Sequence, residues 1–436
     1  MSSSPKLIEV FRQFGDGRWA SVGAYVLPRA NKPGVFGYHA DYDGPPLAPS
    51  LDYRSGNRMF PYAAPRNPNI RGEHTDDLHP VFAQALPGRW GELVLASHSA
   101  AYARATPAEK LFQLGDWQAG GLRFNASDMD IDNYVETYEA LQALQKSIDS
   151  FIQRYASEKV CPFALGRGEH RWALANHGGS QPKAAYVDDM GETFVAKFPR
   201  EILGTYQEAR VEASLSEVSR RAGLKTADTT LISNSDNSSI LLSRRFDVTE
   251  SGVLLHSITG ISAIADPQND YRDLVSFVRQ HGADPGGDVE EIFGRMVLNR
   301  AVNNTDDHLG QWVFLQDEAG KWTLAPNIDV MVTDLDVNGR PVPHKLAMLD
   351  DHEPPLTSAW ILRSGAAFGI DEARASQIAQ RVLAAVMEFP DIARANGVDP
   401  VTLRESIEPA MALAAAERAV RALKDAEAQR FAVPSL

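Results

Sequence analysis

Hydrophobic and polar positions are spaced differently in the first and last parts of the chain. Up to about residue 95, short apolar stretches such as 8–10 and 21–26 alternate with loops rich in Gly and Pro, which is typical of strands and turns. Residues 133–157 place apolar side chains at spacings of three and four, which predicts a long amphipathic helix packed against a core. Beyond residue 254 the pattern is mostly helical. The sequence therefore predicts an α+β fold, β-rich at its beginning and helical at its end.

The spacing changes abruptly in one later stretch. Residues 289–302 are apolar at helical spacing and are followed by the polar run Asn-Asn-Thr-Asp-Asp-His at 303–308. Two short predicted strands, 312–315 and 322–325, flank a Gly-containing turn, and Asp329 follows them. A helix therefore leads into an acid-rich loop, and a hairpin leads to one more acid. An ordinary surface loop with turn-forming Asp and Asn would give the same pattern.

Three polar side chains of this stretch have an order that is used in phosphoryl transfer. Asp306 precedes Gln311 by five residues, and Asp329 follows the hairpin. Protein kinases use an Asp near the substrate hydroxyl, an amide five residues later and a second Asp that binds Mg²⁺. Carboxylate and amide oxygens are hard ligands that suit Mg²⁺ bridging phosphates. The order therefore resembles the catalytic segment of protein kinases.

A Gly-rich turn and a lysine on a strand precede this segment. The turn 177–181 lies between predicted strands at 171–175 and 183–187, and a third predicted strand, 193–198, carries Lys197. Glycines let backbone N–H groups approach phosphate oxygens, and a Lys on the next strand can pair with them. The chain has no GxxxxGK[ST] motif and therefore no Walker loop. Alone, these residues fit an ordinary hairpin with a solvated Lys; upstream of the acids they favour a nucleotide site.

Two further segments fit the same order. A predicted helix over 206–224 carries Glu212, a candidate partner for Lys197, although Glu208 and Glu217 lie on the same helix. The run Arg-Arg-Phe-Asp at 244–247 lies where the chain of a kinase passes from its small lobe to its large lobe. A structural Arg–Asp pair beside a buried Phe would also explain this run.

Composition limits the classes of protein that the chain can belong to. A net charge of −14 argues against a broad basic surface for nucleic acid, although a basic partner could still contact DNA. The single cysteine, Cys161, excludes an internal disulfide and a zinc site of several cysteines, and it fits a reducing cytosol. Neither a secretory signal nor an apolar stretch of membrane-spanning length is expected.

Together these motifs resemble the HipA family, the kinase-like toxins of toxin–antitoxin operons. The resemblance lies in GGSQPKAAYV with VAKF, in LLSRRFD, and in NNTDDHLGQWVF with LAPNIDV, over roughly residues 170–335. The segment PVFAQALPGRWGELVL also looks like the end of that family's first domain. The resemblance implies a kinase-like two-lobe fold. Its parts would be a β-rich N-terminal subdomain over 1–95, a small lobe over 96–243 and a helical C-terminal lobe over 244–436.

The resemblance also implies a role for each motif residue. Asp306 would be the catalytic base that accepts the proton of a Ser or Thr hydroxyl, and Asp307 would shape the loop. Asp329 and Gln311 would hold Mg²⁺. Contacts with ATP are expected from Gly178, Gly179, Ser180, Gln181, Pro182, Lys183, Lys197, Arg244, Arg245, Phe246, His308 and Ile328.

Two positions depart from the family pattern. Gln311 replaces the metal-binding Asn and is longer by one methylene, which matters because Mg²⁺ has strict octahedral demands. Asn176 replaces the regulatory Ser that is autophosphorylated in the family, seven residues before Lys183. Asn cannot be phosphorylated, although Ser180 offers a hydroxyl in the same loop.

The implied function is that of a cytoplasmic, ATP- and Mg²⁺-dependent serine/threonine protein kinase acting as a toxin. Its substrate would be a translation-related protein such as an aminoacyl-tRNA synthetase. Its partner would be a HipB-like helix-turn-helix antitoxin, through which alone the chain would meet DNA. Gln311 and Asn176 also fit an impaired kinase-like module that binds ATP and an antitoxin. A metal-dependent phosphohydrolase built on Asp306, Asp307, His308 and Asp329 is disfavoured, because no second His lies near that loop in sequence.

Overall fold

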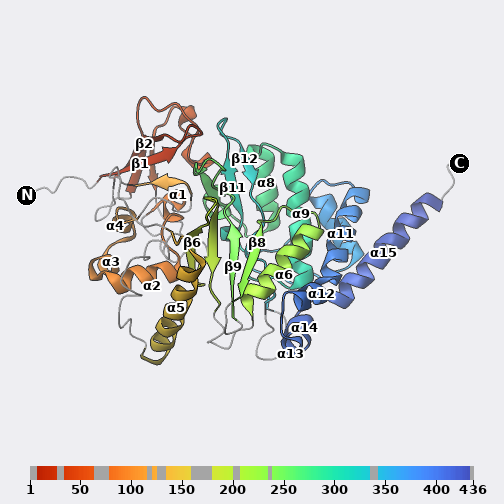
Figure 1. Cartoon of the computed structure of the whole chain (residues 1–436). Helices are drawn as coiled ribbons and strands as arrows, with labels where there is room; N and C mark the ends of the chain where they lie inside the picture. Colours follow the sequence, from red (N-terminus) through yellow and green to blue (C-terminus); the bar gives the residue numbers. More distant parts are fainter. Residues whose placement is uncertain are drawn as a thin grey trace, which may run out of the picture. The chain divides into compact units, whose positions relative to one another are not determined.

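The computed structural model describes most of the chain, and Figure 1 shows the order of its elements. The described residues are 7–26, 34–62, 78–114, 120–124, 134–158, 179–199, 207–233, 238–333 and 342–432. The chain separates into two compact units. The first comprises Met1–Gly204, Ile232–Ala265 and Phe314–Lys321, and the second comprises Thr205–Leu231, Asp266–Val313 and Trp322–Leu436. Both units are discontinuous along the chain. The three continuous domains expected from the sequence, 1–95, 96–243 and 244–436, stay a prediction.

An antiparallel sheet opens the first unit. Its strands are β1 (Leu7–Gln13), β2 (Trp19–Val26), β3 (Gly34–Tyr38), β4 (Met59–Tyr62) and β5 (Leu122–Arg123), in the order β4-β3-β2-β1-β5. Alternate residues of β1 are buried, as expected when one face of a strand meets a core. Tyr25 and Phe36 both pack against Phe82, with ring centroids 5.5 and 5.0 Å apart. The predicted β-rich beginning is confirmed.

Helices follow this sheet earlier than the sequence pattern indicates. α1 (Pro80–Ala83) and most of α2 (Arg89–His98) lie before residue 95, where the pattern predicts strands and loops. Pro80 serves as the first residue of a helix, a position that tolerates Pro because its missing N–H has no helical partner there. Next come α3 (Ala100–Arg104), α4 (Pro107–Leu111) and α5 (Tyr138–Glu158). α5 confirms the helix predicted over 133–157.

A second sheet has the strand order β6-β7-β9-β8. Its strands are β6 (Lys183–Val187), β7 (Thr193–Lys197), β8 (Thr229–Ser233) and β9 (Ser239–Arg244), and α6 (Glu208–Arg221) lies between β7 and β8 in the chain. The apolar side of α5, with Leu141, Ile148 and Phe151, shares one core with Ala184 and Ala196 of the hairpin β6–β7. The predicted strand at 171–175 lies outside the described residues.

The remaining elements are mostly helical, as the sequence predicts. A small sheet has the order β10-β11-β12 and consists of β10 (Ser257–Thr259), β11 (Val313–Gln316) and β12 (Trp322–Leu324). The helices are α7 (Gly260–Ala263), α8 (Tyr271–His281), α9 (Pro285–Val302), α10 (Ser358–Ala367), α11 (Glu372–Met387), α12 (Phe389–Ala395), α13 (Pro400–Thr402), α14 (Glu408–Ala410) and α15 (Leu413–Ala432).

The helix α9 forms the core of the second unit and leads into the acid-rich loop. Asp284 caps it by accepting a hydrogen bond from the N–H of Gly287 (3.1 Å), so it begins at Pro285, four residues before the apolar pattern starts. Ile292, Phe293 and Met296 are fully buried. A helix that is apolar on most sides is stable only when neighbours surround it, and α8 and α11 pack against it.

We expect Phe293→Ala to lower the free energy of unfolding by about 3–5 kcal/mol, because it removes a fully buried ring and leaves a cavity. The ring of Phe293 packs edge-on against that of Phe368, with centroids 6.2 Å apart. Urea unfolding followed by circular dichroism measures the change. Val401→Ala, at a side chain that is 49% exposed, is the control and should shift stability by less than about 0.5 kcal/mol. Equal effects of the two substitutions would contradict this core.

Candidate active site

The loop after α9 begins at a residue with left-handed backbone. Asn303, the C-cap of α9, has φ 56° and ψ 42°, a conformation that Asn adopts more easily than most residues. Its side-chain amide donates to the carbonyl of Thr333 (3.1 Å), and the N–H of Thr333 donates to the carbonyl of Asn303 (3.0 Å). The N–H of Thr305 donates to the Thr333 hydroxyl (3.1 Å). These bonds fix the direction in which the chain leaves the helix.

Asp307 is buried beneath this loop. One carboxylate oxygen accepts from the indole N–H of Trp312 (3.0 Å), and the other accepts from the hydroxyl of Tyr271. Asn299 in turn donates to the Tyr271 oxygen (3.0 Å). Burial raises the pKa of Asp307 to about 6, while the bonds from Tyr271 and Trp312 act in the opposite direction. The carboxylate therefore ties the loop to α8 and α9, which supports the expected structural role of Asp307.

Asp306, the neighbouring acid, faces solvent. Its side chain is 59% exposed, and one of its carboxylate oxygens forms an ion pair with the ammonium of Lys345. The backbone N–H of Lys345 donates to the carbonyl of Thr305 (3.0 Å), so Lys345 is held beside the loop. Adjacent acids thus have opposite environments, one anchored and one accessible. No sequence motif marks Lys345, and the sequence analysis did not single it out.

His308 is the N-cap of the short 3₁₀ helix Leu309–Gln311, and Gln311 is its last residue. Nδ1 of the His308 ring accepts a hydrogen bond from the N–H of Gly310 (3.1 Å). The backbone carbonyl of His308 accepts one from the N–H of Gln311 (2.9 Å). Burial lowers the pKa of His308 and Lys345 lowers it further, whereas Asp306 and Asp329 raise it. The ring is therefore neutral at physiological pH and has both acids and the lysine within electrostatic reach.

Asp329 has an unusual backbone. Its φ is 56°, which costs a residue other than Gly roughly 1–2 kcal/mol, less for Asp and Asn than for others. Such strain persists only where surrounding bonds hold the chain. The N–H of Asn327 donates to the carbonyl of Lys225 (2.7 Å) two residues earlier. Ile328, between them, is half-buried.

A buried cation, Arg295, joins the two segments around Lys225 and Ala325. The guanidinium of Arg295 donates to the carbonyls of Ala325 (2.7 Å) and Lys225 (3.3 Å) and to the carboxylate of Glu291 (2.7 Å). Asp288 accepts from the ammonium of Lys225 (2.9 Å). A buried charge needs such a complete set of partners. Local sequence patterns do not predict this network, because it depends on residues that the fold brings together from distant positions.

Residues expected to meet phosphate lie on the hairpin β6–β7 of the first unit. Lys183 and Lys197 are direct cross-strand partners, and both are buried, at 6% and 5% exposure. Gly179 has φ 93°, and a Cβ at this position would lie 2.9 Å from the Lys183 ammonium. Only glycine therefore fits there without strain. The N–H of Phe198 donates to the carbonyl of Pro182 (2.9 Å) and closes the start of the hairpin.

The other residues of this loop are described only in part. Ser180 is exposed and Gln181 is half-buried. The side-chain amide of Gln181 donates weakly to the carbonyl of Phe198 (3.4 Å). Gly178 and Asn176 lie outside the described residues.

Three acids of α6 were possible partners for Lys197, and their environments differ. Glu217 pairs with Arg221 (2.6 Å) and with Arg220 at the surface. Glu208 is half-buried, whereas Glu212 is buried at 5% exposure. The pairing of Glu212 with Lys197 expected from the sequence stays a prediction.

The run 244–247 contains a structural ion pair. The guanidinium of Arg245 donates twice to the carboxylate of Asp247, at 2.9 and 2.7 Å, and Arg245 is buried. Arg244 pairs with Glu192 (2.6 Å) at the surface. Phe246 is only half-buried, so the buried Phe expected beside the pair is wrong. Both guanidinium groups are paired with carboxylates, and the adenine contact expected at this run stays a prediction.

The donor set of the second unit fits magnesium better than zinc. Among the described residues no three His, Cys, Asp or Glu side chains gather as a metal site. Mg²⁺ commonly takes one or two carboxylates and completes its shell with water and substrate phosphates, so Asp329 with the amide oxygen of Gln311 is a suitable set. The phosphohydrolase alternative needs Asp307 as a ligand. Both Asp307 oxygens already accept hydrogen bonds in the core, which argues against that alternative.

A cluster of polar side chains in the first unit resembles a nucleophile triad but lacks its geometry. Ser21 Oγ lies 2.8 Å and a Glu9 oxygen 2.5 Å from the same nitrogen of His39, Nε2. In a triad the nucleophile and the acid contact opposite ring nitrogens. The cluster is therefore a bridge between neighbouring strands.

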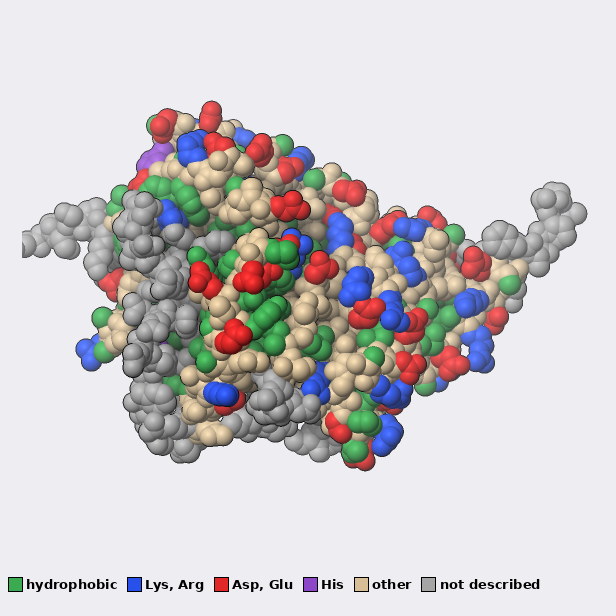
Figure 2. Space-filling view, in the orientation of Figure 1, with side chains coloured by type: hydrophobic (Ala, Val, Ile, Leu, Met, Phe, Trp, Pro, Cys, Tyr) green, Lys and Arg blue, Asp and Glu red, His purple; other side chains and the backbone are tan. Residues whose placement is uncertain are grey.

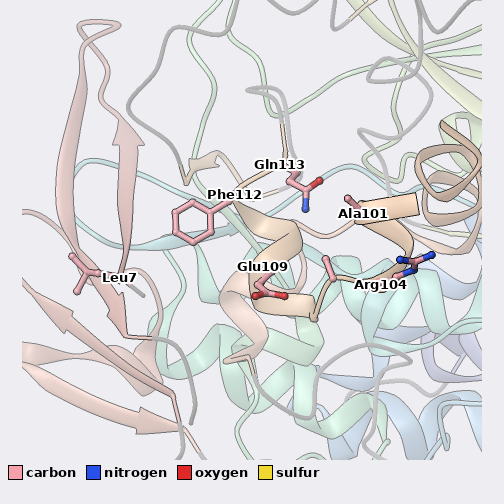
Figure 3. Close-up of a pocket in the computed structure, with 7 residues that line it drawn as sticks. Leu7, Ala101, Arg104, Glu109, Phe112 and Gln113 are labelled. Carbon is pink, nitrogen blue, oxygen red and sulfur yellow. The ribbon is translucent and has the colours of Figure 1, made fainter. Parts of the chain in front are cut away.

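The first unit also has an open pocket of about 580 Å³. Its lining is shown in Figure 3 and consists of Leu7, Ala101, Arg104, Ala105, Glu109, Phe112 and Gln113. None of the predicted site residues lines it. On the face shown in Figure 2, acidic and basic side chains are interspersed, in keeping with a net charge of −14.

The comparison with known families places the predicted motifs in one domain. Residues 175–389 match the family described as the HipA-like C-terminal domain, and this range holds every predicted site residue. This segment is a HipA-like C-terminal domain. The HipA resemblance inferred from the motifs is therefore confirmed. No curated protein sequence matches the chain.

Solved structures extend the comparison to the fold. The chain is similar to HipA of Shewanella oneidensis MR-1, solved in a complex with HipB and operator DNA. The TM-score is 0.64 at 14% identity, over 96% of this chain and 99% of that one. The proinflammatory kinase CtkA of Helicobacter pylori gives a TM-score of 0.37 at 13% identity, over 56% of this chain and 95% of that one. The likeness to the Shewanella HipA structure confirms the expected kinase-like two-lobe α+β fold. Within the described residues, no helix is long and apolar enough to cross a membrane.

We expect Asp307→Ala to lower the free energy of unfolding by about 2–5 kcal/mol, because the donors of Trp312 and Tyr271 lose their buried acceptor. Urea unfolding at neutral pH measures this change. The control is Asp425→Ala, at an exposed position of α15, which should leave stability nearly unchanged. A loss no larger than that of the control would contradict the anchoring role.

The same carboxyl sets the sign of a pH effect. Its folded pKa of about 6 lies above its ordinary value of 3.8. Between these values the folded chain binds a proton more readily than the unfolded chain, so the contribution of Asp307 to stability rises as the pH falls. The unaltered protein should therefore gain stability relative to Asp307→Asn when the pH falls from about 7.5 to about 5. Paired urea titrations test this, and a constant difference would refute it.

Proposed function

We propose that the chain is an ATP- and Mg²⁺-dependent serine/threonine protein kinase that acts as a HipA-like toxin. The observation that carries the proposal is the contrast between the two adjacent acids of the loop. Both carboxylate oxygens of Asp307 accept buried hydrogen bonds, whereas Asp306 is exposed beside Lys345. A general base must be both held in place and accessible to the proton that it accepts. Asp306 meets both requirements.

In the proposed reaction Asp306 accepts the proton of a Ser or Thr hydroxyl. The hydroxyl oxygen forms a bond to the γ-phosphorus of ATP, and the bond from that phosphorus to the bridging oxygen of ADP breaks. The products are a phosphorylated protein and ADP. Little covalent chemistry falls to the protein, so its contribution is to position the groups and to stabilise charge.

The residues of the β6–β7 hairpin would bind the phosphates of ATP. Two buried lysines on directly opposed positions, Lys183 and Lys197, favour an anionic ligand. The backbone of residues 178–182 would approach the phosphates. The run Arg244–Phe246 would meet the adenine, and His308 and Ile328 would complete the nucleotide contacts.

Asp329 and Gln311 would hold the Mg²⁺ ion. When bound, the ion neutralises charge on the phosphate oxygens. The strained backbone at Asp329 supports this role, because residues kept at a left-handed φ commonly serve a function. Gln311 brings the amide oxygen that the ion needs, at the end of a side chain one methylene longer than Asn.

The biological setting of the proposal follows from the relatives. HipA of Shewanella oneidensis was solved with HipB and operator DNA, so we propose a HipB-like helix-turn-helix antitoxin as the partner of this chain. DNA would be met only through that complex. The substrate would be a translation-related protein of the cytoplasm, such as an aminoacyl-tRNA synthetase.

A second candidate function is supported by Gln311. An impaired kinase that binds ATP and an antitoxin without transferring phosphate would tolerate a displaced metal ligand. Such a regulatory module would show saturable ATP binding and no labelled product.

We expect Asp306→Ala and Asp329→Ala each to lower phosphoryl transfer by about 10²–10⁴-fold, because one removes the proposed base and the other a metal ligand. Transfer from radiolabelled ATP to a degenerate library of Ser- and Thr-containing peptides measures the effect. Asp425→Ala serves as the matched control and should transfer at the rate of the unaltered protein. Persistence of full transfer in both variants would overturn the proposed function.

We expect Gln311→Asn to lower the Mg²⁺ concentration needed for half-maximal transfer by up to about tenfold, because the shorter amide is the usual ligand at this position. A Mg²⁺ titration at saturating ATP measures the change. An identical titration curve for both proteins would show that Gln311 does not bind the metal. ATP binding without transfer in both proteins would support the regulatory module instead.

A further inference from the structure

Lys345 lies between two buried side chains in a short segment. His344, Leu346 and Met348 are exposed by 4%, 1% and 0%, whereas the Lys345 side chain is 55% exposed. The segment is held at both ends of this run. The N–H of Lys345 donates to the carbonyl of Thr305 (3.0 Å), and the N–H of Ala347 donates to the carbonyl of Asn269 (2.7 Å). Backbone hydrogen bonds therefore hold the segment beside the loop, and Lys345 is its exposed side chain.

The lysine is the charged group that this segment presents to Asp306. Burial lowers the pKa of His344 to about 4, so that ring is neutral. His308 is also neutral at physiological pH, for the reasons given above. The ammonium of Lys345 contacts one carboxylate oxygen of Asp306, and its charge reaches His308. Cation and base thus face each other within one unit of the protein.

Stability does not explain this pair. Both side chains are more than half exposed, at 55% and 59%, and ion pairs in contact with water contribute little to folding. A cation placed on a proposed base instead affects the chemistry of that base. It fixes the orientation of the carboxylate and leaves the second oxygen directed to other partners.

We propose that Lys345 positions Asp306 and binds the phosphoryl group during transfer; the inference rests on the proposed kinase function. An ammonium has three N–H donors. One donor holds the contacted oxygen of Asp306, and the others are available to oxygens of the γ-phosphoryl group. Donors placed where negative charge develops favour the transition state more than the ground state.

The proton balance of this arrangement is simple. The substrate hydroxyl gives its proton to the second oxygen of Asp306 while its own oxygen bonds to phosphorus. The bond to the bridging oxygen of ADP breaks. Lys345 stays protonated throughout and neither gives nor receives a proton. Its contribution is a fixed positive charge that joins the base to the group being transferred.

Three single variants test the role of the charge. Lys345→Met removes the ammonium and keeps the length of the side chain, Lys345→Arg keeps the charge, and Lys424→Met is the control on exposed α15. We expect Lys345→Met to lower kcat by about 10–100-fold, with the KM for ATP changed by less than about threefold. Lys345→Arg should recover most of kcat, and Lys424→Met should equal the unaltered protein. All melting temperatures should agree.

A double variant tests whether Lys345 acts through Asp306. Since the two groups are in contact, their effects should not add. We expect Lys345→Met to cost less in an Asp306→Asn background than in the unaltered protein, in the same assay with radiolabelled ATP and degenerate Ser/Thr peptides. Full additivity would overturn the positioning role.

The outcomes separate this inference from the function on which it rests. No transfer by the unaltered protein would overturn the kinase function, and this inference with it. Transfer by the unaltered protein and by Lys345→Met at rates within twofold would overturn this inference alone. Equal losses in Lys345→Met and Lys345→Arg would also overturn it, because the positive charge would then not be what matters.

Discussion

A buried carboxylate, with the charge of Arg295 in electrostatic reach, organises the second unit. Asp307 is held by the Trp312 indole and the Tyr271 hydroxyl, and Asn299 extends the bonds into α9. An ionised group in a protein core is tolerated only when nearly all of its acceptor sites are used. This requirement fixes one conformation of the loop, and from that conformation follow the exposure of Asp306 and the turn that carries His308 and Gln311. The proposed chemistry is thus positioned by an acid that takes no part in it.

The sequence was informative wherever a property was local. Alternation and helical spacing located the β-rich beginning, α5 and α9, because burial of one face leaves a period in the chain. Order and spacing also grouped the motifs correctly into one HipA-like domain. Local rules were wrong where a residue type occurs in two kinds of structure. Proline marks turns in many chains, but Pro80 begins the helix α1 here. Phe246 is only half-buried, although one interpretation of the run 244–247 had it buried, because a local pattern does not record how deeply a side chain is packed.

What the sequence could not supply was contact between distant residues. Tyr271 and Asp307 are separated by 36 positions, and Arg295 and Ala325 by 30. Lys345 follows Asp306 by 39 residues, and its neighbours have no motif. Spacing along a strand or helix cannot encode such pairs, since they arise only after helices pack. Of the two adjacent acids, only the fold shows directly which one is accessible.

The discontinuity of the two units limits how the protein can be divided. The first unit draws on three segments of the chain, and so does the second. The HipA-like range 175–389 takes parts of both. A fragment cut at those limits would lack the N-terminal sheet of the first unit, and it would lack nearly all of α12 and the whole of α13 to α15 of the second. The first unit therefore completes its packing only after residue 321 has been synthesised, when two of the three segments of the second unit are already part of the chain, so no single cut separates the two units.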